Sequence, residues 1–173
     1  MNSDFILTKD NVFNLEECKR LIKTYKKNLK LHNIIDYYYS DILIKEFKFL
    51  DRLSKVINVY IKTYPEINLT PSLWALDSLR FKFFKKGQSF KNYHSEVGLP
   101  TPYRVLGLQI YLTNNKCGTE FYRSKKIIES KIGRVCIFPA YFTHTHRGQI
   151  DLKKERSIIT GYYSFCKHEG KIK

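Results

Sequence analysis

The pattern of apolar and polar positions changes once along the chain, near residue 70. Before this point, apolar residues recur at the spacing of an amphipathic helix. After it, short segments alternate apolar and polar residues and are separated by turn residues, which is typical of strands. The sequence therefore predicts a helical front over residues 1–70 and a strand-rich core over residues 73–166.

Two helices are predicted in the front part. The first begins at Asn14, a good N-cap residue, and Glu17 occupies the position that completes a capping box. The second is expected to start near Ser40 or Asp41 and to end before Pro65, because the apolar residues between them form one stripe. Both helices are expected to brace one face of a sheet.

The back part contains short segments with strand character. They span residues 79–83, 104–113, 119–122, 126–129, 134–138 and 157–165. Turn signals such as Lys86-Gly87 and Asn114-Asn115 separate them, and this spacing favours an antiparallel barrel or jelly roll. No internal repeat or low-complexity linker interrupts the chain, so a single domain over residues 1–173 is expected.

Composition indicates a globular chain with a basic surface. Hydrophobic residues make up 43% and aromatic residues 15% of the sequence, which excludes a disordered chain. The formal net charge of +15 favours a polyanion such as nucleic acid as a partner. The lysines are nevertheless scattered, and no arginine-rich arm is present, so a solvated basic surface is the preferred interpretation.

The four cysteines, Cys18, Cys117, Cys136 and Cys166, are widely spaced and form no CxxC pair. This spacing predicts neither a zinc site nor a disulfide framework, and Cys136 is expected to be a buried thiol. The N-terminal residues lack the pattern of a signal peptide, and no apolar run reaches the roughly 18 residues of a membrane span. We therefore expect a cytoplasmic chain with reduced thiols and no membrane partner.

The most specific chemistry lies in His94, Glu96 and a later histidine. On an extended segment, residues two apart point to the same side, so His94 and Glu96 can reach one metal ion. Either His144 or His146 can supply a third ligand. Two imidazoles and one carboxylate bind ferrous iron on one face and leave the other face open. Arg156 can then hold a carboxylate through two parallel hydrogen bonds.

In this order, the motifs resemble those of the 2-oxoglutarate- and Fe(II)-dependent oxygenases. The similarity is to the prolyl-4-hydroxylase-like branch, especially to small marine phage and bacterial members with an HxE motif. The matching segments are residues 84–96, 104–113, 118–121, 133–139, 144–148 and 156–161. The resemblance implies a mainly β fold, the double-stranded β-helix or cupin-like jelly roll, braced by the two N-terminal helices.

The resemblance also implies roles for individual residues. The implied iron ligands are His94, Glu96 and His146. The last ligand of the family precedes an arginine–glycine pair, and this selects His146 over His144. Arg156 would bind the distal carboxylate of 2-oxoglutarate, and Thr160 would line the same pocket because it lies on the same face of the strand.

Three features depart from the pattern of the family. Glu96 stands where most relatives have aspartate, and it keeps the charge while reaching one methylene further. Phe84 replaces a tyrosine whose hydroxyl contacts 2-oxoglutarate in many relatives, so this contact is expected to be missing. Cys117-Gly118 replaces a glycine pair and Ser157 replaces an aromatic residue, and both changes affect packing more than chemistry.

The implied reaction converts 2-oxoglutarate to succinate and CO₂ while a C–H bond is hydroxylated, with ascorbate as an optional further cofactor. The preferred substrate is a peptide or protein, with proline as the leading target, or else a small molecule. Arg104 and Arg147 are candidates for substrate contact near the mouth.

Two alternatives stay open. The first is the same chemistry on nucleic acid, as in oxidative demethylation. It is less favoured because the sequence shows neither an arginine-rich lid nor a base-stacking aromatic pair. The second is a non-catalytic jelly-roll binding module, which Glu96 and Phe84 would favour.

Overall fold

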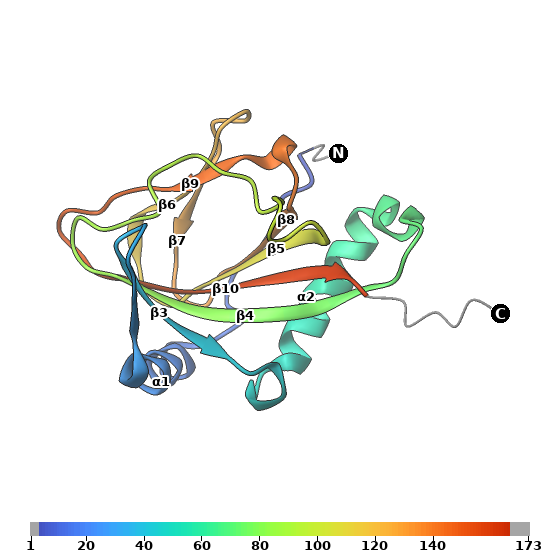
Figure 1. The fold of residues 1–173 in the computed structure, drawn as a ribbon. Helices are drawn as coiled ribbons and strands as arrows, with labels where there is room; N and C mark the ends of the chain where they lie inside the picture. The colour runs from blue at the N-terminus through green and yellow to red at the C-terminus, as the bar shows by residue number, and fades with distance from the viewer. Residues whose placement is uncertain (1–3, 167–173) are drawn as a thin grey trace.

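Two antiparallel sheets face each other, with helices on the outer side of the larger sheet (Figure 1). The computed structural model describes residues 4–166. The large sheet has the strand order β1-β8-β5-β10-β4-β3-β2. Its strands are β1 (Leu7–Lys9), β2 (Lys30–His32), β3 (Tyr37–Ile42), β4 (Trp74–Phe84), β5 (Arg104–Tyr111), β8 (Val135–Pro139) and β10 (Arg156–Phe165).

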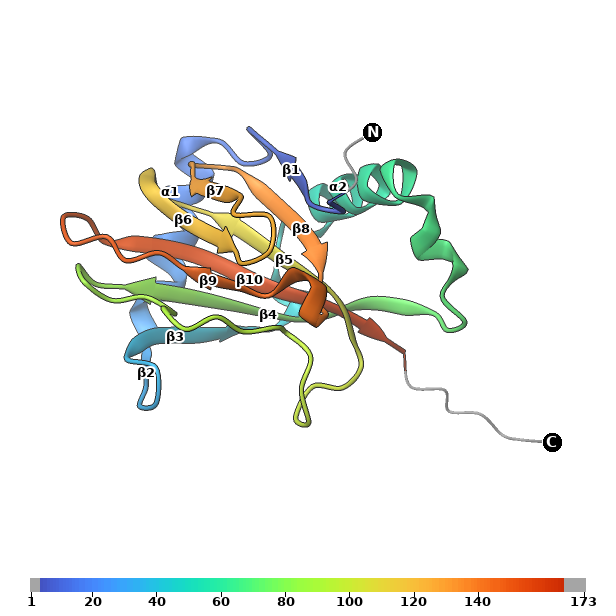
Figure 2. The ribbon, with the colours of Figure 1, turned by 90° about the horizontal axis from the view of Figure 1, so that it is seen from above.

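The small sheet covers the inner face of the large one and has the order β7-β6-β9. Its strands are β6 (Asn115–Phe121), β7 (Ile127–Ser130) and β9 (His146–Gly148). Figure 2 shows β10 at the centre of the large sheet, between β4 and β5, with which it pairs. This arrangement of two facing sheets confirms the expected jelly roll.

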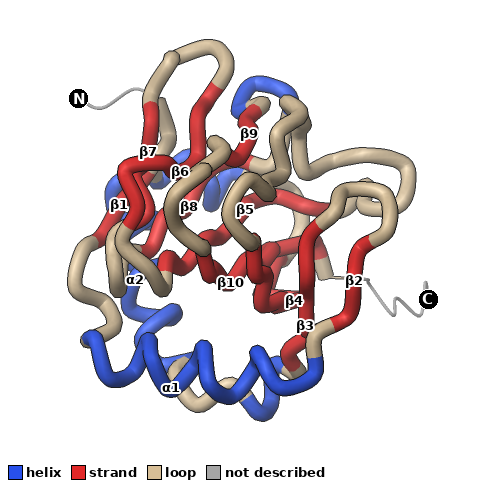
Figure 3. The backbone as a smooth tube through the Cα atoms, turned by 90° about the vertical axis from the view of Figure 1, so that its left-hand side faces the viewer, coloured by secondary structure: helices blue, strands red, loops and turns tan. Residues whose placement is uncertain are grey.

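Two α-helices, α1 (Leu15–Tyr25) and α2 (Leu50–Thr63), pack on the outer face of the large sheet, as predicted. Figure 3 shows α1 on the side of the strands away from β6, β7 and β9. Short 3₁₀ turns complete the connections. They are η1 (Lys26–Asn28), η2 (Ile44–Glu46), η3 (Pro65–Leu69) and η4 (Phe142–His144). Within residues 4–166, none of the helices has the length and apolar character needed to cross a membrane.

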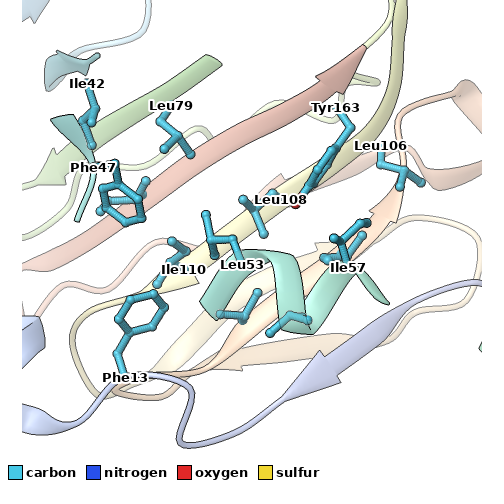
Figure 4. Close-up of a cluster of buried hydrophobic side chains, with 14 of the residues drawn as sticks. Phe13, Ile42, Phe47, Leu53, Ile57, Leu79, Leu106, Leu108, Ile110 and Tyr163 are labelled. Carbon is cyan, nitrogen blue, oxygen red and sulfur yellow. The ribbon is translucent and has the colours of Figure 1, made fainter. Parts of the chain in front are cut away.

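The main hydrophobic core lies between the helices and the large sheet. Leu53 and Ile57 of α2 face Leu108 and Ile110 of β5 (Figure 4). Each such buried side chain contributes about 1.5–3 kcal/mol relative to an exposed one. The helices therefore fix the large sheet from behind and leave its inner face for the site.

Alternation along β4 divides its side chains between two environments. Phe81 and Phe83 point into the main core against the helices. Lys82 and Phe84 point the other way and line a pocket between the two sheets. The period-two pattern of a strand therefore places a lysine inside the molecule.

The predicted start of α1 is confirmed in detail. The backbone N–H of Glu17 donates to Asn14 Oδ1 at 2.9 Å, and the N–H of Asn14 donates to Glu17 Oε2 at 2.8 Å. Glu17 also forms an ion pair with Arg52 of α2, with 2.6 Å between Oε1 and Nη2. Glu17, which completes the capping box of α1, therefore also links α1 to α2.

The expected start of the second helix near Ser40 is wrong. Residues 37–42 form β3, which pairs with β4, and α2 begins only at Leu50. Three consecutive tyrosines at the start of β3 favour a strand. Asp41 forms an ion pair with Arg80 on the neighbouring strand, with Oδ1 2.7 Å from Nε. Pairing with a distant strand therefore keeps residues 40–42 out of the predicted helix.

The predicted strands all occur, as β4, β5, β6, β7, β8 and β10. The short strands β1, β2, β3 and β9 were not predicted, and the front part thus supplies three strands to the large sheet in addition to its helices. The four cysteines are free thiols, and Cys136 is buried, as expected.

Candidate active site

His94, Glu96 and His146 meet between the two sheets. One ligand atom from each lies within 4.8 Å of the others. His146 Nε2 is 3.3 Å and His94 Nε2 is 3.9 Å from Glu96 Oε1. No other group of three or more His, Cys, Asp and Glu side chains within residues 4–166 converges in this way. The structure therefore brings together the three residues that were expected to bind metal.

The backbone holds the two imidazoles side by side. His94 and His146 form an isolated antiparallel bridge, in which the N–H of each donates to the carbonyl oxygen of the other at 2.9 Å. The N–H of Glu96 donates to the carbonyl oxygen of Ala140, also at 2.9 Å. The segment from His94 to Glu96 is thus held at one end by β9 and at the other by the residue after β8, which fixes the positions of its side chains.

Hydrogen bonds at the far side of each ring set the tautomers. His94 Nδ1 lies 2.9 Å from the carbonyl oxygen of Asn92, and His146 Nδ1 lies 3.0 Å from that of His144. A carbonyl oxygen only accepts, so each ring donates to it through Nδ1 and turns its Nε2 towards the cluster. Burial, with repulsion from His146, lowers the pKa of His94 to about 4. This ring is therefore neutral at pH 7.

Glu96 is buried and ionised. Burial acts to raise its pKa, but close contact with His146 and the charge of Lys82 outweigh it and lower the pKa to about 2. Arg104 Nη1 lies 3.4 Å from Glu96 Oε2 and 3.1 Å from the Glu96 carbonyl oxygen. The Arg104 guanidinium also stacks on Tyr162, 3.4 Å from the ring centroid. The Glu96 carboxylate therefore lies next to both imidazoles through Oε1 and next to Arg104 through Oε2.

A second polar cluster surrounds Arg156, which is only 4% exposed. Its Nη2 donates to Ser89 Oγ at 2.9 Å, and its Nη1 donates to the Gly118 carbonyl oxygen at 3.3 Å. The guanidinium carbon lies 5.1 Å from the centroid of the Phe84 ring. Arg156 Nε and Thr160 Oγ1 are buried and have no hydrogen-bond partner within residues 4–166. Since each such group costs about 1–3 kcal/mol, they indicate a site for an acceptor-bearing ligand.

One narrow pocket joins the two clusters. Besides the residues already described, it is lined by Lys82, Phe90, Gln109, Tyr111, Thr119, Gly148 and Ile158. Its cavity volume is about 30 Å³, so a five-carbon dicarboxylate enters only when side chains move. Lys82 and Phe90 are half-buried and also line an outer groove.

His144 lies outside this pocket. Its Nε2 is 2.7 Å from the Asp4 carbonyl oxygen, and its Nδ1 is 2.9 Å from Thr143 Oγ1. The 3₁₀ turn η4 ends at His144 and β9 begins at His146, so the two rings do not share a face despite their spacing. Local geometry thus agrees with the choice of His146.

Several pocket residues were not predicted. Gln109 accepts hydrogen bonds from Tyr111 Oη at 2.8 Å and from Thr119 Oγ1 at 2.5 Å. The signal was available, since Gln109 is the one strongly polar residue in the apolar run from 105 to 112. Lys82 had the pattern of a solvent-facing residue, and only the second sheet shows that it is covered.

The two arginines considered for substrate contact differ. Arg104 reaches the site through Glu96. Arg147 pairs with Glu120, with 3.0 Å between Nη2 and Oε2, and it does not line the pocket.

Comparisons with known proteins identify the fold. No protein-family model matches the chain, and neither does any curated protein sequence. Solved structures do match. The viral collagen prolyl hydroxylase of Paramecium bursaria Chlorella virus-1, in complex with 2-oxoglutarate, has a TM-score of 0.77 and 19% identity over 96% of this chain and 98% of that one.

Two further solved structures share the fold. A Trichoplax adhaerens prolyl hydroxylase, in complex with a peptide of the hypoxia inducible factor oxygen degradation domain, has a TM-score of 0.68 and 15% identity, over 95% of this chain and 85% of that one. HygX from Streptomyces hygroscopicus, with nickel and 2-oxoglutarate bound, has a TM-score of 0.68 and 9% identity, over 94% and 84%. The chain therefore has the fold of the prolyl-hydroxylase-like 2-oxoglutarate- and Fe(II)-dependent oxygenases.

Proposed function

We propose that this chain is a single-domain Fe(II)- and 2-oxoglutarate-dependent dioxygenase that hydroxylates a C–H bond of a peptide or protein and releases succinate and CO₂. One observation carries the proposal. A cluster of two imidazoles and one carboxylate shares a pocket with a buried arginine whose Nε lacks a partner. The cluster suits ferrous iron, and the arginine suits the far carboxylate of a dicarboxylate co-substrate.

His94, Glu96 and His146 are assigned as the iron ligands. The neutral His94 ring presents an unprotonated Nε2, and Glu96 presents a charged oxygen, so neither of these two groups has to lose a proton before a metal binds at pH 7. Bound iron supplies the activation of dioxygen, and ascorbate is the optional reductant that keeps it ferrous. The carbonyl oxygens of Asn92 and His144 hold the rings in the productive tautomer.

Arg156 and Thr160 are assigned to the distal carboxylate of 2-oxoglutarate. Ser89 and Gly118 already hold two nitrogens of the guanidinium, so little side-chain freedom is lost when a ligand binds. Each hydrogen bond to the ligand carboxylate contributes about 1.5–3 kcal/mol. Phe84 presents the face of its ring to Arg156. Because it has no hydroxyl group, Arg156 and Thr160 are assigned to bind the distal carboxylate without a hydrogen bond from this position.

Apolar side chains cover the site on the side of His146. The centroid of the His146 ring lies 4.7 Å from that of Phe138 and 5.6 Å from that of Phe121. Ile158 closes the pocket from β10. A dry wall of this kind limits side reactions of an oxidising centre with solvent.

A peptide or protein is the proposed substrate, with proline as the leading target. The support is the fold, which this chain shares with solved prolyl hydroxylases, one of them in complex with a peptide. The net charge of +15 favours nucleic acid as the second candidate.

An anaerobic titration tests the proposal. Addition of Fe(II) and then 2-oxoglutarate should produce a weak visible charge-transfer band in the wild type. The band should vanish in His94→Ala and persist in His144→Ala, the matched control outside the pocket. Absence of both the band and bound metal in the wild type would favour a non-catalytic jelly-roll module. Succinate release with proline-containing peptides, compared with methylated single-stranded DNA, separates the two substrate classes.

A further inference from the structure

An outer groove opens beside the candidate iron ligands. Its volume is about 290 Å³, and His94 and Glu96 form part of its wall. Three cationic side chains, Arg80, Lys82 and Arg104, also line it. Because the groove shares His94 and Glu96 with the inner pocket but is not lined by Arg156, it offers a substrate access to the iron while 2-oxoglutarate occupies the inner pocket.

Lys82 is the cation of this groove without a partner. Arg80 pairs with Asp41, and Arg104 pairs with Glu96. The ammonium group of Lys82 makes no ion pair or hydrogen bond with any residue from 4 to 166, and its nitrogen lies 5.5 Å from the centroid of the Tyr37 ring. Burial lowers the pKa of Lys82 to about 8 against the attraction of Glu96, so the group stays mostly charged at pH 7.

The surroundings of Lys82 make an unpaired charge expensive. On the sheet its neighbours are Ile158 of β10 and Tyr39 of β3. An ammonium group covered by apolar and aromatic side chains is destabilising unless an anion accompanies it. Nothing in the packing of β4 requires a lysine here, since Phe81 and Phe83 make the contacts with the main core.

When Fe(II) and 2-oxoglutarate bind, the negative charge of Glu96 no longer offsets the positive charge of Lys82. Fe(II) brings two positive charges, Glu96 one negative, 2-oxoglutarate two negative and Arg156 one positive, and these cancel. Glu96 then binds the metal, and the positive charge of Lys82 remains available to a substrate that enters the groove.

We infer that the substrate is an acidic peptide, in which a carboxylate close to the reacting C–H bond binds to Lys82. This inference rests on the proposed function and names its substrate class. Arg104 and Arg80 add to the positive potential of the groove, while Lys82 is free to form the direct contact.

The rim of the groove favours a peptide over nucleic acid. The segment Val97-Gly98-Leu99-Pro100-Thr101-Pro102-Tyr103 borders it and contains no charged residue. Leu99 is 99% exposed, and Tyr103 is 57% exposed. A polynucleotide leaving the groove would need cations along its path, whereas an apolar rim suits the side chains of a peptide.

Peptide binding to the loaded, oxygen-free protein tests the inference. Fe(II) and 2-oxoglutarate are added first, and the charge-transfer band is recorded. Fluorescent peptide pools with Glu, Gln or Lys fixed next to a central proline are then titrated and followed by anisotropy. The Glu pool should bind the wild type about tenfold more tightly than the Gln pool, because a charged hydrogen bond is gained.

Variants of Lys82 show whether this residue is responsible. In Lys82→Met, the ratio of affinities for the Glu and Gln pools should fall close to one. In Lys82→Glu, the preference should reverse towards the Lys pool, a result that misfolding does not produce. Lys85→Met, an exposed lysine further along the same chain segment, should keep the wild-type ratio.

The outcomes distinguish this inference from the proposed function. If the wild type forms no band and binds no metal, both fail. If the band forms and the pools bind equally, or none binds, only the inference fails. It is also overturned if Lys82→Met weakens 2-oxoglutarate binding and leaves the peptide ratio unchanged, or if single-stranded DNA displaces the Glu pool in a manner that depends on Lys82.

Discussion

His94 and His146 face each other in a single antiparallel bridge, with both of their backbone hydrogen bonds 2.9 Å long. The bridge joins the long connection between β4 and β5 to β9 of the small sheet. The ring centroids are 4.6 Å apart as a result. The spacing of the two imidazoles is therefore set by backbone pairing, and a side-chain change at the third ligand should leave it intact.

Glu96→Gln should lower the affinity for Fe(II) by at least about tenfold, because the amide keeps the size of the side chain and removes its charge. Glu96→Asp keeps the charge but draws the oxygens back by one methylene, so it should give a smaller loss. Equilibrium dialysis under argon, with metal content read by atomic absorption, measures both. An unchanged affinity in Glu96→Gln would remove this residue from the ligand set.

Gly148→Ala should weaken 2-oxoglutarate binding by about tenfold while Fe(II) binding is preserved. A Cβ at this position would lie 2.5 Å from Ser89 Oγ and 3.0 Å from Arg156 Nη2, and so displace the hydrogen bond that orients the guanidinium. Calorimetric titration of 2-oxoglutarate into the metal-loaded protein measures the loss. Gly98→Ala is the matched control, since its Cβ would meet only Pro100 Cδ, at 3.8 Å. Equal losses in the two variants would contradict the proposed role of Arg156.

The residues that were predictable from sequence are those fixed by local rules. The capping box of Asn14 needs only three further residues, and the alternation of His94 and Glu96 needs only an extended segment. The choice between His144 and His146 depends on a 3₁₀ turn that the spacing does not reveal. It came from the resemblance alone, and the geometry agrees with it.

The residues that were missed depend on contacts between distant segments. The end of β3 was expected to begin a helix, and its pairing with β4 decided its structure. Lys82 alternates with Phe81 and Phe83 as a solvent-facing residue would, but the small sheet covers that face. A period-two pattern gives the two faces of a strand without saying which of them meets a second sheet.

Asn14→Ala should lower the free energy of unfolding by about 1 kcal/mol, the usual effect of losing an N-cap side chain. The Asn14 side chain accepts from the N–H of Glu17, which would lose its partner. Urea unfolding followed by circular dichroism measures the change. Asn14→Asp replaces the amide oxygen with a carboxylate oxygen and should retain the stability, so a loss of similar size in both variants would show that the cap is not the cause.

The ion pairs of Asp10 should make stability depend on pH in the acid range. Hydrogen bonds from Arg134 and Lys131 lower the pKa of Asp10 to about 2 from an ordinary value of 3.8. A carboxyl whose pKa is depressed by folding stabilises the protein above its unfolded pKa, and this contribution is lost as the pH falls towards the folded pKa. This stabilisation is therefore lost between about pH 4 and pH 2. The ion pairs connect the segment after β1 to the residues just before β8. Because the Asp10 side chain is 35% exposed, water and salt screen the pairs and the effect should be modest.

Urea unfolding at several pH values should show a shallower acid slope in Asp10→Asn than in the wild type. Glu16→Gln, which removes a largely exposed pair with Lys19, should keep the wild-type slope. An unchanged slope in Asp10→Asn would place the acid sensitivity elsewhere.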